Sequence, residues 1–192
     1  QDRSVIFIGL PPRFSCTLQN AQIARQMCSR PEQIFIYDGK CIGINLGKLA
    51  MAASQLAESG RAPDFIFGQL DLLRQRMASV LWANDMSAIV NNGRADDLLR
   101  RFASVINIQP VLALTPEGAP QLIRLTRTLA QGIDALIDFV RQRGLAPGEV
   151  LCVGHFDAPA AAAQLAAKAR EQLGTGPEQI VILEGGNLLY LH

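Results

Sequence analysis

Short apolar runs alternate along the chain with longer stretches in which apolar residues recur every three or four positions. The short runs have the length of buried strands, whereas the three- and four-residue spacing is typical of helices with one buried face. The pattern predicts strands over residues 4–9, 33–37, 79–83, 110–114, 121–126, 150–153, 179–183 and 187–191. It predicts helices over residues 17–28, 47–59, 63–75, 95–105, 128–143 and 158–173.

The order of these elements predicts an α/β protein with two domains. Strands separated by helices of this length form βαβ crossovers, so we expect a largely parallel sheet in a first domain, residues 1–76. In a second domain, residues 77–192, two predicted strands flank the turn sequence TPEGAP. We therefore expect a locally antiparallel, mixed sheet in the second domain.

Composition narrows the classes of function. The chain has 192 residues, of which 49% are hydrophobic, so it has ample material for a core. Its net charge of +1 gives no support for a nucleic-acid partner or an anionic membrane surface, both of which call for a basic excess. No apolar run approaches the ~20 residues that a membrane span needs. No secretory signal pattern is present either.

The cysteines and histidines argue against disulfide-bonded and metal-binding proteins. The four cysteines form no CxxC pair, which favours free thiols in a reducing compartment, and we expect a cytoplasmic protein. The two histidines, His155 and His192, lie far apart without ligand-type neighbours, so we expect no metal site. Because the chain begins with Gln1 directly before a strand and ends directly after another, we also expect a fragment, or a chain without ordered ends.

The segment LPPRFSCTLQNAQ joins a predicted strand to a predicted helix and contains Ser15 and Thr17. In open α/β sheets, ligands bind outside the carboxyl ends of the strands, where helices begin. Helix N-termini attract anions, and hydroxyl groups there are able to donate to a carboxylate or a phosphate. The alternative is that one of the two residues is only an N-cap, worth ~1 kcal/mol of stability. The spacing leaves both interpretations open.

Arg127 and the two histidines are the remaining candidates. Arg127 follows the strand sequence QLIRLT, where it would clamp an oxyanion or stand as a surface charge. His155 and His192 also follow predicted strands, where each would be a ligand or a hydrogen-bonded structural residue. The sequence contains no GxSxG, Walker A or GxGxxG motif, and no nucleophile paired with a base. We therefore expect a binding protein without catalytic residues.

Taken together, the segments that follow the predicted strands resemble those of the DegV family of bacterial fatty-acid-binding proteins. VIFIGLPPRFSCTLQNA resembles the family's strand followed by Ser-Ser-x-x-Ser-Gly-Thr-Tyr and a helix. FIYDGKCIGINLG resembles its strand ending in Asp-Ser or Asp-Thr before a glycine-containing helix start. SAIVNNGRADDLL resembles the Leu-x-x-Gly-Gly-Arg segment.

The second half of the chain carries the rest of the resemblance. INIQPVLAL followed by RLTRT resembles the family's Ile-Lys-Pro-Ile-Leu strand with a later Lys-Val-Arg-Thr. VGHFDAP resembles the histidine corner before the last helix, and EGGNLLYLH resembles the closing Gly-Pro-x-x-x-x-His. The pieces occur in the family's order and together span essentially the whole chain.

The resemblance implies a fold and a function. It implies a parallel three-layer α/β/α domain, truncated at its N-terminal side, and a two-layer α/β domain with a mixed sheet. It implies that one long-chain fatty acid lies with its acyl tail in an apolar tunnel and its carboxylate at the domain interface. A separate ATP-dependent fatty acid kinase subunit would phosphorylate that carboxylate, with no cofactor in this chain. Ser15, Thr17, Arg127 and His192 are the matching positions for the carboxylate site.

The chain departs from the family pattern at several of these positions. Pro11 and Pro12 stand where the family has paired serines, Cys16 replaces a glycine, and Gly39 replaces Ser or Thr. The family's Thr-Ser-Gln-Pro-Ser motif would lie before Gln1, and its Gly-Pro-Gly would lie after the last residue. Two alternatives therefore stand beside the lipid carrier. One is a phosphotransferase related to dihydroxyacetone kinases, and the other is a degenerate relative that has lost lipid binding.

Overall fold

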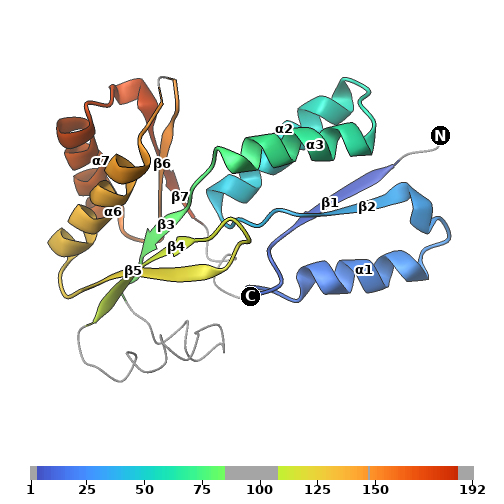
Figure 1. The fold of residues 1–192 in the computed structure, drawn as a ribbon, viewed down its shortest axis with the longest axis horizontal. Helices are drawn as coiled ribbons and strands as arrows, with labels where there is room; N and C mark the ends of the chain where they lie inside the picture. The colour runs from blue at the N-terminus through green and yellow to red at the C-terminus, as the bar shows by residue number, and fades with distance from the viewer. Residues whose placement is uncertain (1–3, 85–107, 147, 186–192) are drawn as a thin grey trace. The chain divides into compact units, whose positions relative to one another are not determined.

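Unit 1 is built on two parallel strands with helices on both sides (Figure 1). The computed structural model describes residues 4–84, 108–146 and 148–185. In unit 1, β1 (Val5–Gly9) pairs in parallel with β2 (Ile34–Asp38), with Val5 opposite Ile34 and Gly9 opposite Asp38. The connection contains α1 (Thr17–Met27) and the short 3-10 helix η1 (Pro31–Gln33). It is the parallel crossover that the sequence predicts.

Two further helices, α2 (Ile44–Glu58) and α3 (Pro63–Gln75), complete unit 1. Figure 1 shows them on the side of the strands opposite to α1. Leu49 and Ala53 of α2, and Ile66 and Leu70 of α3, are buried. Each pair is four residues apart, so each helix turns one apolar stripe toward the same core. The Tyr37 side chain of β2 packs into this core as well.

The described residues of unit 2 form two small sheets. β3 (Val80–Trp82) pairs antiparallel with β4 (Gln109–Leu114), and β4 also neighbours β5 (Pro120–Thr126). After α6 (Leu129–Arg143), β6 (Leu151–His155) pairs in parallel with β7 (Ile180–Glu184). The α7 helix (Pro159–Leu173) and the 3-10 helix η2 (Pro177–Gln179) connect β6 to β7. The antiparallel pair and the parallel pair thus lie in separate sheets, and the single mixed sheet expected for the second domain stays a prediction.

Alanine and isoleucine form the second core. Ala162, Ala166 and Ala169 face inward from α7 at three- and four-residue spacing. Small side chains let α7 approach Ile133 and Ile137 of α6 closely. The alanine-rich segment of the sequence is thus a packing surface.

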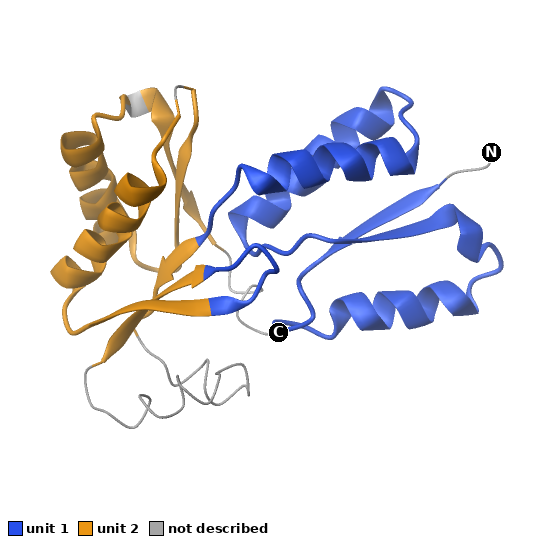
Figure 2. Ribbon diagram, viewed as in Figure 1, with its two compact units in different colours: residues 1–79, 114–120 blue, residues 80–113, 121–192 orange. Residues whose placement is uncertain are grey.

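The two compact units are not two simple halves of the chain (Figure 2). Unit 1 comprises residues 1–79 together with 114–120, and unit 2 comprises residues 80–113 and 121–192. The chain therefore leaves unit 2 after Ala113, adds a short turn to unit 1, and returns at Gln121. The domain boundary expected between residues 76 and 77 stays a prediction.

Most elements begin and end within three residues of their predicted bounds. The helix predicted over 63–75 has those bounds as α3, and α2 begins three residues before its predicted start. The predicted helix 95–105 and the predicted strand 187–191 lie outside the described residues. No helix in the described ranges is both long enough and apolar enough to cross a membrane.

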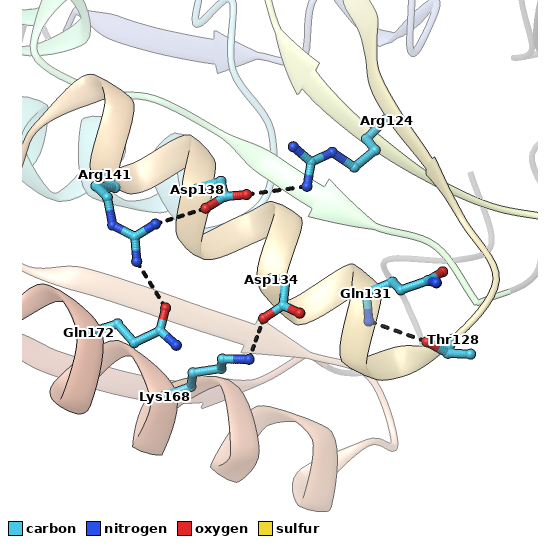
Figure 3. Close-up of polar contacts among 8 residues, drawn as sticks. All are labelled: Arg124, Thr128, Gln131, Asp134, Asp138, Arg141, Lys168 and Gln172. Atoms are coloured by element: carbon cyan, nitrogen blue, oxygen red, sulfur yellow. Dashed lines mark hydrogen bonds and ion pairs between the residues drawn. The ribbon is translucent and has the colours of Figure 1, made fainter.

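Ion pairs fasten the outer faces of α6 and α7 (Figure 3). Asp138 accepts hydrogen bonds from Arg124 at 3.2 Å and from Arg141 at 2.8 Å. Arg141 also donates to Gln172 of α7 at 2.9 Å, and Lys168 forms an ion pair with Asp134. These side chains are partly exposed, so each pair contributes little alone, ~0–1 kcal/mol. Of the two basic residues near the β5–α6 corner, Arg124 and Arg127, Arg124 is thus paired with Asp138.

A buried polar chain joins the strands of unit 2. Thr126 is 2% exposed, and its hydroxyl donates to the carbonyl oxygen of Gln109 at 2.6 Å. The Thr126 hydroxyl oxygen in turn accepts the indole N–H of Trp82 at 3.1 Å. The Trp82 ring lies against Gly132 of α6, where any side chain would collide with it. Thr126 thus pairs polar groups from β3 and β4 beneath the start of α6.

The substitution Thr126→Val should lower the free energy of unfolding by about 1–3 kcal/mol, because it leaves the Trp82 and Gln109 groups buried and unpaired. Urea denaturation followed by the fluorescence of Trp82, the single tryptophan, measures this. Thr126→Ser keeps the hydroxyl and serves as the control. Equal stability of Thr126→Val and wild type would contradict the role given to this hydroxyl.

Candidate functional site

The corner between β1 and α1 contains the two hydroxyl residues that the sequence analysis singled out. The carbonyl oxygen of Pro11 accepts hydrogen bonds from the N–H groups of Phe14 at 2.9 Å and Ser15 at 3.3 Å. Ser15 Oγ then accepts from the N–H of Thr17 at 3.1 Å, and it lies 2.5 Å from Thr17 Oγ1. The two hydroxyl groups therefore form a pair at the first turn of the helix.

Ser15 acts as the cap of α1. Cys16 occupies the N-cap position but makes no side-chain cap hydrogen bond, and Thr17 is the first helical residue. Ser15 satisfies the Thr17 N–H in place of Cys16. Within the pair, one hydroxyl hydrogen bridges the two oxygens, which leaves the other hydrogen available to an acceptor such as a carboxylate. Ser15 therefore makes a capping hydrogen bond that is compatible with ligand binding, and the role of Ser15 and Thr17 as ligand-binding residues stays a prediction.

Three residues that depart from the family pattern, Pro11, Pro12 and Gly39, differ in their surroundings. Pro11 is fully buried, whereas Pro12 is exposed, so the two prolines are not equivalent. A side chain at Gly39 would collide with Leu46 of α2 and approach the carbonyl oxygen of Gly9, which already accepts the Gly39 N–H at 3.0 Å. A serine or threonine at position 39 would therefore require the Leu46 side chain to shift.

A polar group that the sequence analysis did not single out lies beside the same strand ends. The Tyr37 hydroxyl donates to Asp71 at 2.9 Å, and Arg74 lies 3.6 Å from the same carboxylate. Burial, followed by the hydrogen bond to Asp71, raises the pKa of Tyr37 to about 12. Burial also raises the pKa of the Cys41 thiol to about 11. Asp71 and Arg74 are three residues apart on α3, a helical spacing that identifies the pair in the sequence. Their partner Tyr37 lies too far away in the chain to be found this way.

Arg127 lies at the corner between β5 and α6, in unit 2. Its N–H donates to Gln131 Oε1 at 2.9 Å, while Thr128 caps α6 by accepting the Gln131 N–H at 3.3 Å. The backbone of this corner is therefore fixed. The Arg127 side chain is exposed, and within the described ranges its guanidinium makes no hydrogen bond or ion pair. Among the described residues, the Arg127 guanidinium thus has no partner, whereas its neighbour Arg124 pairs with Asp138.

The histidines differ in what the structure describes. His155 ends β6, and its Nδ1 is buried with no hydrogen-bond partner among the described residues. His192 lies outside the described residues.

The residues predicted to share a carboxylate site belong to different units: Ser15 and Thr17 to unit 1, and Arg127 to unit 2. The shared carboxylate site expected for these residues and His192 stays a prediction. Among the described residues, no three His, Cys, Asp or Glu side chains gather as metal ligands.

The fold and the motifs agree with a known family. Over residues 1–192 the chain matches the family model described as "Uncharacterised protein, DegV family". The chain belongs to the DegV family. The resemblance inferred from the motifs is confirmed.

A DegV domain-containing protein of Clostridium perfringens is 20% identical over 55% of this chain and 38% of its own length. One of Streptococcus pyogenes is 22% identical over 70% of this chain and 48% of its own. The matches thus span less than half of these relatives.

Solved DegV structures share the fold. The DegV family protein of Eubacterium eligens, loaded with heptadecanoic acid, has a TM-score of 0.81 at 20% identity, over 99% of this chain and 70% of that one. The Streptococcus pneumoniae fatty acid kinase (Fak) B3 protein, loaded with linoleic acid, has a TM-score of 0.80 at 19% identity, over 99% and 68%. The α/β fold class predicted from the sequence is confirmed.

The substitution Ser15→Ala should lower the stability by about 1 kcal/mol, because the Thr17 N–H loses its acceptor. Amide hydrogen exchange in the first turn of α1 should become faster as well. Urea denaturation and exchange measured by mass spectrometry test both effects. Ser54→Ala, an exposed change within α2, is the matched control. If Ser15→Ala and Ser54→Ala behave alike, Ser15 is not the cap.

Cys41 should resist iodoacetamide at about pH 8, near the ordinary pKa of a free thiol, because only the thiolate reacts. Its labelling rate should rise as the pH approaches about 11, the raised pKa of this thiol. Cys16, Cys28 and Cys152 are exposed and should react first. Peptide mapping after timed labelling measures the order, and unfolding in urea should make all four thiols equivalent. Early labelling of Cys41 in the folded protein would contradict its burial.

Proposed function

We propose that this protein binds a long-chain fatty acid and presents its carboxylate to a separate ATP-dependent fatty acid kinase. The observation that carries the proposal is the fold match over 99% of this chain to a DegV protein loaded with heptadecanoic acid. A second neighbour, loaded with linoleic acid, is named as the B3 protein of fatty acid kinase. We propose a cytoplasmic carrier whose catalysis and ATP belong to the kinase, with the fatty acid as its only small-molecule ligand.

The chemistry of a fatty acid sets two demands on such a carrier. Each buried methylene contributes ~0.8 kcal/mol, so an apolar tunnel provides most of the affinity. The carboxylate must find hydrogen-bond donors, because an unpaired buried charge costs several kcal/mol. A carrier therefore needs a few donors at one end and no catalytic group.

Four residues are the proposed donors. The Ser15–Thr17 pair offers a hydroxyl hydrogen beside the positive end of α1. Arg127 offers a guanidinium whose donors are free within the described part of the chain, and it stands on a fixed backbone. His192 is proposed from the family motif alone. The support for Ser15, Thr17 and Arg127 is that their local geometry leaves donors without a partner in the part of the chain that the structure describes.

Native mass spectrometry of the full-length protein purified from cells tests the binding. An added mass equal to one acyl chain is expected. A bare polypeptide that also fails to take up linoleic acid and heptadecanoic acid would overturn the proposal and favour the relative without lipid binding. Turnover of ATP by the isolated protein would favour the phosphotransferase instead.

The substitution Arg127→Ala should weaken linoleic acid binding about tenfold or more, because a charge-assisted hydrogen bond to the carboxylate is lost. Arg170→Ala removes the same charge from an exposed position on α7 and should bind as wild type does. Equilibrium titration of the lipid-free proteins measures both affinities. Equal affinities for the two variants would remove Arg127 from the site while leaving lipid binding itself standing.

A further inference from the structure

The turn between β4 and β5 belongs to unit 1, although both strands belong mainly to unit 2. We call this turn, residues 114–120, the strap. Internal hydrogen bonds keep it closed: the Thr115 N–H donates to the carbonyl oxygen of Ala119 at 2.8 Å, and the Gly118 N–H donates to that of Thr115 at 2.9 Å. Gly118 has φ +80°, which favours glycine. The strap is therefore a preformed turn.

The strap lies against the carboxyl ends of both strands of unit 1. A Cβ atom at Gly118 would lie 2.9 Å from Lys40 Cα, 3.0 Å from the Lys40 carbonyl oxygen and 3.0 Å from Pro11 Cγ. Pro11 follows β1 and Lys40 follows β2. Only a residue without a side chain permits this approach, and the contact explains why Pro11 is fully buried.

Arg74 holds the strap through a directed hydrogen bond. Its Nη1 donates to the carbonyl oxygen of Pro116, 42 residues away in sequence, at 2.9 Å. The Arg74 side chain is 17% exposed, and Asp71 orients it while accepting a hydrogen bond from Tyr37. A chain of polar contacts thus runs from β2 through α3 to the strap. Because the donor is charged and largely buried, this bond is stronger than an ordinary surface contact.

This arrangement suggests a conformational role for the strap. Ligands of open α/β sheets bind outside the carboxyl ends of the strands, the edge that the strap covers. Ser15 follows Pro11 by four residues and lies in the same connection. An element that covers a binding edge and has to open changes the rates of uptake and release together, and it leaves the equilibrium largely unchanged.

We propose that Arg74 latches the strap onto the ends of β1 and β2, and that opening of this latch sets the rates at which fatty acid is taken up and released. The control of fatty acid uptake and release rests on the proposed function, whereas the latch itself does not. Arg74 is then a positioning residue that contacts the strap and not the ligand.

Hydrogen exchange of the lipid-free, full-length protein tests the latch. Arg74→Met should raise the exchange rate of strap amides about tenfold, because a charge-assisted hydrogen bond is lost. Arg74→Lys keeps a charged donor and should restore most of the protection. Lys48→Met, an exposed charge removal on α2, is the matched control. Unchanged strap exchange in Arg74→Met would overturn the latch.

Stopped-flow measurements with linoleic acid test the effect on ligand exchange. Arg74→Met should speed both association and dissociation about tenfold, whereas the dissociation constant should stay within about twofold. A purely structural role would weaken binding without this paired change in rates. If amide hydrogen exchange in the strap becomes faster while the association and dissociation rates of linoleic acid stay unchanged, only the gating role is overturned. If wild type binds no lipid, the proposed function and the gating fail together, and hydrogen exchange still decides the latch.

Discussion

The parallel pairing of β1 with β2 is the constraint on which the rest of unit 1 depends. Two parallel strands cannot be joined by a tight turn, so the chain must cross over through α1. That crossover brings the start of α1, with Ser15 and Thr17, to the edge where both strands end. Lys40 follows β2 at the same edge, and the strap lies against it. The hydroxyl groups and the strap are therefore neighbours of the same strand ends because of strand direction, although they are far apart in sequence.

Side-chain hydrogen bonds hold irregular backbone in unit 1 and join strands in unit 2. Ser15 caps α1, Arg74 fixes the strap, and Thr126 pairs buried groups of β3 and β4. Each bond satisfies a polar group that would otherwise lose its hydrogen bonds to water. Because these bonds are directional, they fix the corners more narrowly than apolar packing does. A binding protein gains from such corners, since donors that are already placed lose little entropy when a ligand arrives.

The proposed function assigns binding of the fatty acid to this protein and the chemistry to a separate kinase. A carrier needs apolar volume and a few unused donors, whereas chemistry requires a nucleophile, a base or a metal site. The donors of the Ser15–Thr17 pair and of Arg127 fit the first description. The two family serines replaced by proline have separate meanings. Pro11 contributes to the contact with the strap, whereas Pro12 is exposed. The departure at Pro11 is thus tied to the packing of unit 1.

The amino-acid sequence alone determined the order of strands and helices, the βαβ crossovers and the family. Apolar periodicity is a local property, and α3 has the predicted bounds because Pro63 and an apolar stripe mark them within one segment. Candidate donors at strand ends also followed from local pattern. Only the tertiary structure decided that Ser15 rather than Cys16 provides the cap acceptor for α1, that Arg124 pairs with Asp138, and that Arg74 binds Pro116. It also showed that the Arg127 guanidinium has no partner among the residues that the structure describes. Those contacts depend on where distant segments meet or on torsions at a single corner, and neither leaves a periodic trace in the chain.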